Sequence, residues 1–221
     1  RQRLGWLRLA WPPMRAALPT LLLLSAGSQV IAGEERVLFA AGCFWSVELA
    51  YQRVPGVLKT AVGYAGGTTP SPTYHAVTTG TTGHTETVEV VYDPQKVSFE
   101  RLVDLFWQLH DPTSLNRQGG DVGTQYRSAI FYYTESQRAA IEASRAKLPA
   151  NTASRVVTEI ASAAEPGFIW EPGEDYHQRY LQKGGQDATV GSLKPIQCYG
   201  NRGPIKEMDK PEIKAILKGE L

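Results

Sequence analysis

The sequence predicts an α+β protein, a two-layer α/β sandwich in which helices cover one face of a mixed sheet. Two observations favour this class. Stretches that alternate between apolar and polar residues take turns with stretches of helical periodicity, and the expected strands are not apolar throughout. The sequence also contains neither a Gly-x-Gly-x-x-Gly fingerprint nor a phosphate-loop motif, which argues against a doubly wound nucleotide-binding fold.

The expected elements come in the order β-α-β-β-α-β-α-β, and the first six have the order of a ferredoxin-like core. A polar loop is expected at 110–127. The strands are expected at 36–41, 57–64, 84–92, 128–133 and 155–161. The helices are expected at 44–53, 98–109 and 134–148, followed by a short helix at 176–183 and a terminal one at 211–218.

Local signals set several of these boundaries. Pro55 breaks the helix that starts at residue 44, and Ser98 is the expected N-cap of the next helix. Thr134 and Gln137 have the spacing of a capping box, which predicts a helix that begins beside them. Pro211 suits the first turn of a helix and therefore supports the terminal one.

The first 32 residues differ in character from the rest of the chain. They contain four arginines and no acidic residue, and an apolar stretch at 16–26 is followed by Val-Ile-Ala at 30–32. This pattern is typical of a secretory signal peptide, and its apolar core is shorter than the roughly 20 residues that span a bilayer. We therefore expect a leader, with Met14 as a candidate native start, and a periplasmic protein that begins at Gly33. The alternative is a non-native leader in front of a cytoplasmic protein.

Residues 33–221 show no sign of a second domain. No internal repeat is present, and the turn-rich stretch 66–83 is too short for an interdomain linker. The formal net charge of +1 becomes −3 without the four leader arginines (+1 − 4), so no basic field points to nucleic acid. We expect a single domain, a monomer without stable membrane insertion.

Cys43 follows Gly42 at the point where the first expected strand passes into the first helix. Backbone N–H groups and the dipole at a helix N-terminus stabilise a thiolate, which makes such a cysteine nucleophilic near neutral pH. Phe44 and Trp45 would form an apolar wall beside it. A buried, inert cysteine is the competing interpretation. The chain has two cysteines, so a permanent Cys43–Cys198 disulfide is a further alternative for an exported protein.

Two other stretches supply polar groups. Glu86 is expected on the same strand face as Val88 and Val90, and a carboxyl group on an apolar face has a raised pKa. It is therefore a candidate general acid, the alternative being an edge-strand glutamate that reaches solvent. The second stretch is the polar loop at 110–127, because long polar loops usually serve function.

Three motifs together resemble the peptide methionine sulfoxide reductases of the A type. They are Gly-Cys-Phe-Trp at 42–45, Gly-His-Thr-Glu at 83–86 and Gly-Thr-Gln-Tyr-Arg-Ser at 123–128. The resemblance covers roughly residues 35–200 and implies a two-layer α/β sandwich on a mixed sheet. It also implies that residues 33–221 are one catalytic domain, which reduces methionine-S-sulfoxide, free or in oxidised proteins, and so repairs them.

The resemblance assigns roles to residues of this sequence. It makes Cys43 the nucleophile that becomes a sulfenic acid, and Glu86 the acid that protonates the sulfoxide oxygen. Cys198 becomes the resolving cysteine, whose disulfide with Cys43 is reduced by thioredoxin or a similar dithiol. The other implied site residues are Phe44 and Trp45 for the S-methyl group, Tyr74 and Tyr126 for the oxygen, and Asp121 in the same polar cluster. This chemistry requires no metal or organic cofactor.

The sequence departs from the family pattern near its C-terminal end. Some relatives carry a further cysteine shortly before the resolving one, but here Gly191 is followed by Ser192. A relay through two successive disulfides therefore has no second partner, and the direct bridge between Cys43 and Cys198 remains.

Two other functional classes compete with the reductase. A cysteine hydrolase would use a histidine as base to Cys43, and the candidates are His75, His84, His110 and His177. A disulfide-stapled binding domain of the periplasm would instead keep both cysteines in a bond that never turns over. The His-x-Glu at 84–86 also occurs in zinc deaminases, but their Pro-Cys-x-x-Cys is absent here.

Overall fold

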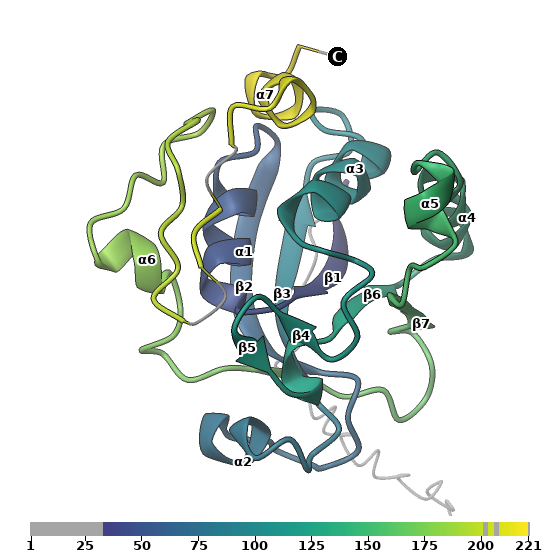
Figure 1. Ribbon diagram of the computed structural model, residues 1–221, viewed down its shortest axis with the longest axis vertical. Coiled ribbons are helices and arrows are strands. Elements are labelled where there is room, and N and C mark those ends of the chain that lie inside the picture. The colour runs from purple at the N-terminus through teal and green to yellow at the C-terminus, as the bar shows by residue number, and fades with distance from the viewer. Residues whose placement is uncertain (1–32, 201–202, 206–207, 221) are drawn as a thin grey trace, which may run out of the picture.

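The computed structural model describes residues 33–200, 203–205 and 208–220 (Figure 1). Within these residues, six strands form one mixed sheet in the order β7-β6-β1-β3-β2-β8. Neighbouring strands are antiparallel, except that β6 and β7 run parallel. The strands of this sheet are β1 (Glu35–Ala41), β2 (Val57–Ala65), β3 (Thr85–Tyr92), β6 (Ser128–Tyr132), β7 (Glu159–Ser162) and β8 (Trp170–Pro172). A separate hairpin pairs β4 (Arg117–Gln118) with β5 (Asp121–Val122).

The inner strand order β6-β1-β3-β2 is that of a ferredoxin-like core. Helix α1 leads from β1 to β2, and α3 leads from β3 to β6, so each helix connects two strands that have a third between them. The predicted α+β class and its βαββαβ core are confirmed. The helices are α1 (Phe44–Gln52), α2 (Tyr74–Thr78), α3 (Phe99–Leu109), α4 (Glu135–Ala146), α5 (Ala150–Ala153), α6 (Tyr180–Lys183) and α7 (Pro211–Lys218).

The main core lies between one face of the sheet and the helices. Phe39 of β1 stacks on Tyr51 of α1, with ring centroids 4.9 Å apart, and on Phe106 of α3 at 5.4 Å. All three side chains are fully buried, which stabilises the fold by about 2 to 3 kcal/mol each. Ile141 of α4 and Ile213 of α7 belong to the same cluster, so these four helices share one side of the sheet (Figure 1).

The opposite face of the sheet has a smaller core. Leu38 of β1 and Phe131 of β6 are fully buried there. Phe168 covers Phe131 with ring centroids 5.1 Å apart, and Trp170 of β8 packs on the same cluster. This face is therefore covered by the chain segment that leads into β8, while the helices occupy the first face.

Helix ends follow the sequence signals in most places. Thr134 Oγ1 accepts a hydrogen bond from the Gln137 N–H at 3.2 Å, as a capping box requires. The Gln137 side chain accepts from the Tyr133 N–H at 2.8 Å, one residue earlier than in a complete capping box. Helix α7 has the predicted bounds, with Pro211 in its first turn and Gly219 in left-handed conformation after its end.

Three predicted boundaries are wrong. The strand expected at 155–161 begins only at Glu159, because the Val157 N–H donates to the Pro112 carbonyl at 2.9 Å and lies outside the sheet. The helix expected at 176–183 is reduced to the four residues of α6, because Arg179 has a left-handed φ of 52°. The helix expected at 134–148 ends two residues earlier, at Ala146.

The short elements near the site were not predicted: α2, β8 and, within the expected polar loop, β4, β5 and a 3-10 turn at Thr124–Tyr126. The turn-rich stretch before α2 hides its N-cap, Thr73, whose hydroxyl accepts from the Ala76 N–H at 3.3 Å. Strand β8 is three residues long and ends in proline, so it has no periodicity to detect. The predicted leader at 1–32 lies outside the described residues. Within the described ranges, no helix has the length and apolar character needed to cross a membrane.

Candidate active site

Cys43 is the N-cap of α1 and follows β1 directly, as the sequence predicted. Gly42 makes the turn between them with a φ of 86°, a left-handed conformation that favours glycine. The Cys43 side chain is 5% exposed, and Phe44 behind it is almost fully buried. The thiol is therefore held by two packed elements at the end of an inner strand.

Cys198 lies beside Cys43, and the two reduced thiols are in hydrogen-bond contact. This contact raises the pKa of the Cys43 thiol, and burial and the Glu86 carboxyl raise it further. The Trp45 backbone N–H, at the start of α1, lowers this pKa but is outweighed. Cys43 is thus protonated in this arrangement, which corrects the expectation that the helix N-terminus makes it a thiolate.

Glu86 lies on β3, an inner strand between β1 and β2, and faces α1. Its side chain is 3% exposed, and Oε2 accepts a hydrogen bond from the Phe44 N–H at 3.0 Å. Burial raises the pKa of Glu86 to about 8 against the opposing effect of that N–H, and the nearby Asp121 and Cys198 add to the rise. The carboxyl is mostly protonated at neutral pH. The alternative of a solvent-exposed edge glutamate is wrong.

A cavity of about 40 Å³ brings the predicted site residues together. Seven of the eight sequence-predicted residues line this cavity, and the eighth, Cys198, contacts Cys43 instead. The lining residues are Cys43, Phe44, Trp45, Tyr74, Glu86, Asp121, Tyr126 and Gly200. They come from α1, α2, β3, β5, the 3-10 turn η1 (Thr124–Tyr126) and the C-terminal segment, so the site forms only in the folded chain.

Two tyrosines supply hydroxyl groups to this cavity. Tyr74 begins α2, and Tyr126 ends η1. Burial raises the pKa of both phenols, and the Glu86 carboxyl raises both further. Both hydroxyls therefore remain neutral and can donate a hydrogen bond to an oxygen in the cavity. Asp121, the first residue of β5, is 5% exposed and lines the same cavity.

The apolar wall is larger than the sequence analysis predicted. The Trp45 ring stacks on Tyr180, with ring centroids 4.0 Å apart and planes 13° apart. The Trp45 indole N–H donates to His177 Nδ1 at 3.2 Å. The aromatic run at 176–180 is the sequence signal that could have placed these two residues beside Trp45.

Gly200 is a second residue that the sequence analysis missed. A Cβ at this position would lie 3.1 Å from Asp121 Oδ2 and 3.6 Å from Cys198 Sγ. A side chain here would therefore crowd the Asp121 carboxylate and contact the Cys198 sulfur. The signal was its position two residues after Cys198, but glycine alone does not show what it approaches.

Three of the four histidines form ring hydrogen bonds to groups other than Cys43. The His84 ring accepts from the Gly67 N–H at 3.2 Å and contacts the Thr69 carbonyl at 2.8 Å. The His110 ring contacts the Phe106 carbonyl at 2.9 Å and the Ser128 hydroxyl at 2.7 Å. His75 is exposed on α2, and His177 accepts from Trp45. Among the residues described, no group of three or more His, Cys, Asp or Glu side chains could hold a metal.

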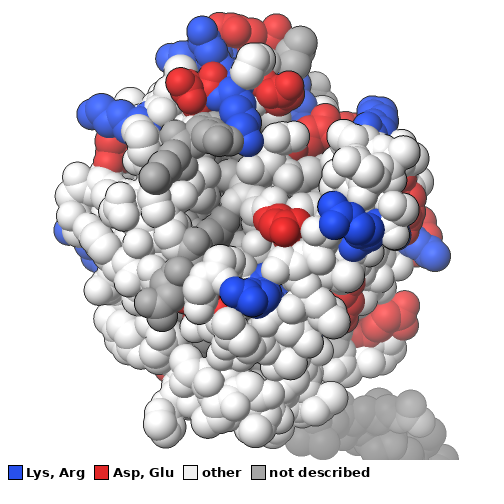
Figure 2. Space-filling model, in the orientation of Figure 1, with Lys and Arg blue, Asp and Glu red and all other residues white. Residues whose placement is uncertain are grey.

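Charged side chains are unevenly distributed over the visible face. Figure 2 shows acidic and basic side chains gathered around α7, while the surface over α2 carries none.

A pair of reduced thiols beside a protonated carboxyl provides the functional groups that a thiol-dependent oxidoreductase needs. Residues 35–197 match the family model described as peptide methionine sulfoxide reductase. The chloroplastic peptide methionine sulfoxide reductase A4 of Arabidopsis thaliana is 53% identical over 174 residues, which are 76% of this chain and 66% of that protein. The A2-1 enzyme of Oryza sativa subsp. japonica is 52% identical over 179 residues, which are 80% of this chain and 94% of that protein.

Solved structures give the same result. Methionine sulfoxide reductase A of Corynebacterium diphtheriae has a TM-score of 0.63 and 44% identity, covering 70% of this chain and 77% of that one. Reduced Mxr1 of Saccharomyces cerevisiae has a TM-score of 0.63 and 31% identity, covering 71% of this chain and 88% of that one. The chain belongs to the peptide methionine sulfoxide reductase family, A type, a family of oxidoreductases that act on methionine sulfoxide.

Proposed function

We propose that this chain reduces methionine-S-sulfoxide, free or in oxidised proteins, to methionine, and so repairs oxidised proteins. One observation carries the proposal. A carboxyl group with a pKa of about 8, Glu86, shares a cavity of about 40 Å³ with the Cys43 thiol. Reduction of a sulfoxide by a thiol needs an acid for the oxygen and a nucleophile for the sulfur, on opposite ends of one S–O bond.

In the first step, Glu86 gives its proton to the sulfoxide oxygen and the Cys43 sulfur attacks the substrate sulfur. The new S–S bond forms as the S–O bond breaks, and the oxygen leaves as water with the proton from Glu86 and the proton from the Cys43 thiol. This water then attacks the Cys43 sulfur, so that the S–S bond breaks, methionine leaves, Cys43 becomes a sulfenic acid and the released proton returns to Glu86. Because the Cys198 contact keeps Cys43 protonated, the attack requires that Cys198 first moves away.

Neighbouring residues orient the substrate for this attack. Tyr74 and Tyr126 hold the sulfoxide oxygen through their hydroxyls, and Asp121 lies in the same polar cluster. Phe44 and Trp45 bind the S-methyl group against their rings. All five residues line the cavity, and their roles follow the family pattern residue by residue.

In the second step, the Cys198 thiol attacks the sulfenic acid and releases water, which leaves a Cys43–Cys198 disulfide. An external dithiol, thioredoxin or a similar protein, then reduces the disulfide and is itself oxidised. The contact between the two thiols supports a direct bridge, because no large movement is needed to form it.

The experiment that tests this function is turnover with the separate S and R epimers of a methionine sulfoxide derivative, with dithiothreitol as reductant. We expect methionine to form from the S epimer only. A site that hydrolyses esters, or thiols that react with neither epimer, would overturn the proposal. The cysteine hydrolase remains the weaker alternative, because the described histidine contacts run to groups other than the Cys43 sulfur.

We also propose that the leader directs export and that the mature protein is a periplasmic monomer beginning at Gly33. The support is the acid-free leader with its apolar stretch at 16–26. N-terminal sequencing of the protein from its native host tests this, together with sedimentation for the monomer. A cytosolic protein that still carries Met14 would contradict the proposal.

A further inference from the structure

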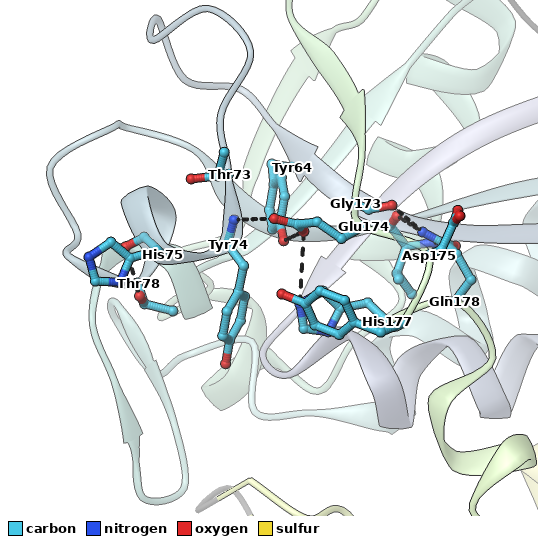
Figure 3. Close-up of polar contacts among 12 residues, drawn as sticks. Tyr64, Thr73, Tyr74, His75, Thr78, Gly173, Glu174, Asp175, His177 and Gln178 are labelled. Carbon is cyan, nitrogen blue, oxygen red and sulfur yellow. Dashed lines mark hydrogen bonds and ion pairs between the residues drawn. The ribbon is translucent and has the colours of Figure 1, made fainter.

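The carboxylate of Glu174 lies between Tyr64 and Tyr74, although Glu174 does not line the cavity (Figure 3). Its Oε1 accepts a hydrogen bond from the backbone N–H of Tyr74 at 2.8 Å. Its Oε2 accepts from the Tyr64 hydroxyl at 2.6 Å. Both carboxylate oxygens are therefore committed to groups on two different elements, α2 and β2.

Each of these partners is adjacent to a residue of the proposed chemistry. Tyr64 is the direct cross-strand partner of Glu86, so its side chain stands beside the acid on the same face of the sheet. The Tyr64 ring also lies 6.1 Å from that of Phe44. Tyr74 itself contributes the hydroxyl that we assign to the sulfoxide oxygen. Glu174 thus connects Tyr64, which lies beside the acid Glu86, to Tyr74, which holds the sulfoxide oxygen.

The third neighbour of Glu174 leads to the apolar wall. Because His177 Nδ1 accepts from the Trp45 indole, a neutral ring carries its proton on Nε2. This buried Nε2 lies 3.9 Å from Glu174 Oε2, within the attraction of the carboxylate although beyond hydrogen-bond distance. The His177 ring in turn packs on the Tyr74 ring, with centroids 4.5 Å apart (Figure 3).

The backbone around Glu174 is itself fixed to the sheet. The Gly173 N–H donates to the Val62 carbonyl of β2 at 2.8 Å. The Gln178 amide accepts from the Val62 N–H and donates to the Val62 carbonyl, both at 2.9 Å. The carboxylate is therefore attached to a short segment that is hydrogen-bonded to β2 on both sides of it.

Glu174 is ionised, which strengthens its hydrogen bonds to Tyr64 and Tyr74. Hydrogen bonds from Tyr64 and Tyr74 lower the pKa of Glu174 and outweigh the effect of partial burial. The group is ionised at neutral pH, and hydrogen bonds to a carboxylate are about twice as strong as those between neutral groups.

We propose that Glu174 is a positioning residue for the sulfoxide reduction. It holds Tyr74 at the distance from Glu86 that the substrate S–O bond requires. The inference rests on the proposed function, because it assigns Tyr74 to the sulfoxide oxygen. Glu174 does not touch the reacting atoms and acts through Tyr74.

The test is a double-mutant cycle between Glu174→Ala and Tyr74→Phe, read as the single-turnover rate constant for the S epimer. We expect E174A to lower this rate constant by about 10- to 100-fold, because misplacement of an oriented group by about 1 Å has effects of that size. The half-saturating substrate concentration should change much less. In the Y74F background, where the hydroxyl is already missing, E174A should lower the rate by no more than about twofold.

Conservative variants keep the test decisive if E174A folds poorly. Glu174→Gln retains an acceptor for the Tyr74 N–H and a donor for the Tyr64 oxygen, so it should recover most of the rate. Glu174→Asp keeps the charge but is too short to reach both partners, so its rate should stay low. Asp175→Ala is the matched control, because it removes an exposed carboxylate from the next residue.

Equal losses from E174A in the wild-type and Y74F backgrounds would show a general structural effect and overturn the proposal. So would wild-type rates for E174D together with E174A, or a loss in E174Q as large as that in E174A. The wild-type protein is assayed in parallel with the same epimer. If it forms no methionine, the proposed function fails, whereas an active wild type with an equally active E174A rejects only the role of Glu174.

Discussion

Cys43 and Cys198 carry the same thiol group and are in contact, yet the chain around each is built differently. Cys43 joins an inner strand to a helix, and every side chain from Val37 to Ala41 of that strand is fully buried. Cys198 belongs to the segment 184–200, in which the described chain forms neither a helix nor a strand of the sheet. An isolated β-bridge pairs Ile196 of this segment with Ile205.

This difference corresponds to the two chemical steps. The first step needs a thiol, an acid and a sulfoxide in fixed geometry, which packed elements supply. The second step needs a thiol that leaves its contact, returns to a sulfenic acid and then meets an external dithiol. A segment outside the sheet can make such movements at low energetic cost, because it breaks few backbone hydrogen bonds.

The segment that carries Cys198 is nevertheless anchored at its base. The fully buried Arg53, at the end of α1, donates from Nε to the Asp187 carbonyl at 2.8 Å. It also donates from Nη1 to the Lys194 carbonyl at 2.6 Å. Nearer the thiol, Ile196 exchanges backbone hydrogen bonds with Ile205, and Gln197 exchanges hydrogen bonds with the Gln186 side chain. These anchors keep Cys198 within reach of Cys43.

The largest effects are expected when each cysteine is replaced in turn, because each substitution should stop a different step. Cys43→Ser should abolish the first step, because the sulfur itself forms the bond to the substrate. Cys198→Ser should still form about one equivalent of methionine per enzyme in a burst and then stall with a sulfenic acid on Cys43, which dimedone traps. Turnover with thioredoxin should be lost, while dithiothreitol partly restores it. A quench-flow assay and mass spectrometry measure both results, and a burst from C43S would contradict the assignment.

The next largest effect is expected at Glu86. Glu86→Gln keeps the shape but removes the acid, so the first step should slow by about 10²- to 10⁴-fold with little change in substrate affinity. Glu89→Gln is a matched control, since Glu89 is equally buried on the opposite face of the same strand and pairs with Arg36. Activity of E86Q within about twofold of wild type would remove Glu86 from the mechanism.

The pH dependence of the same step gives a second measure. The pKa of Glu86 is raised from 4.5 to about 8 in the folded chain, so the proton needed for donation is lost as pH rises through about 8. The single-turnover rate constant should therefore fall above that pH, and E86Q should lack the decline. The free energy of unfolding should also fall as the pH rises. The contribution of Glu86 is fully present below its unfolded-state pKa of 4.5 and is lost as the pH rises to its folded-state pKa of about 8. Urea unfolding at pH 5 and 8 tests this, and a pH-independent rate in the wild type would refute it.

Substitution of Arg53 should slow disulfide formation, the second step, without slowing sulfoxide reduction, the first step. Arg53→Met removes two hydrogen bonds and should lower the free energy of unfolding by about 2 to 4 kcal/mol. With the segment released, disulfide formation after the burst should slow by about tenfold, because the effective concentration of Cys198 falls. The burst itself should change less than about threefold. The exposed Arg155→Met is the control, and equal slowing of both steps would argue against a separate anchor.

The smallest effect is expected far from both thiols. Thr134→Ala removes the N-cap of α4 and should lower the free energy of unfolding by about 1 kcal/mol. Neither the burst nor disulfide formation should change at a temperature where the variant is folded. A change in either rate would show that α4 contributes to the site, contrary to its position on the far side of α3.

The sequence could predict regular elements and residue types, but not distances. The periodicity of 84–92 placed Glu86 on the buried face, and the Gly42 turn placed Cys43 at a helix start, because both signals are local. The Cys198 contact that raises the pKa of Cys43 joins residues from opposite ends of the chain, so no local pattern contains it. The same holds for Gly200 beside Asp121 and for Glu174 beside Tyr74.

The pairing of β3 has a consequence for how this protein tolerates insertions and deletions. Glu86 pairs with Tyr64 on one side, and its strand also pairs along β1, so the register is fixed from both sides. Insertion of a single residue between Thr87 and Tyr92 would turn the acid to the opposite face of the sheet and bring Thr87 toward α1. Changes of length should therefore accumulate in the turn-rich stretch 66–73 and be excluded from the strand, which a library of one-residue insertions scored for methionine release would reveal.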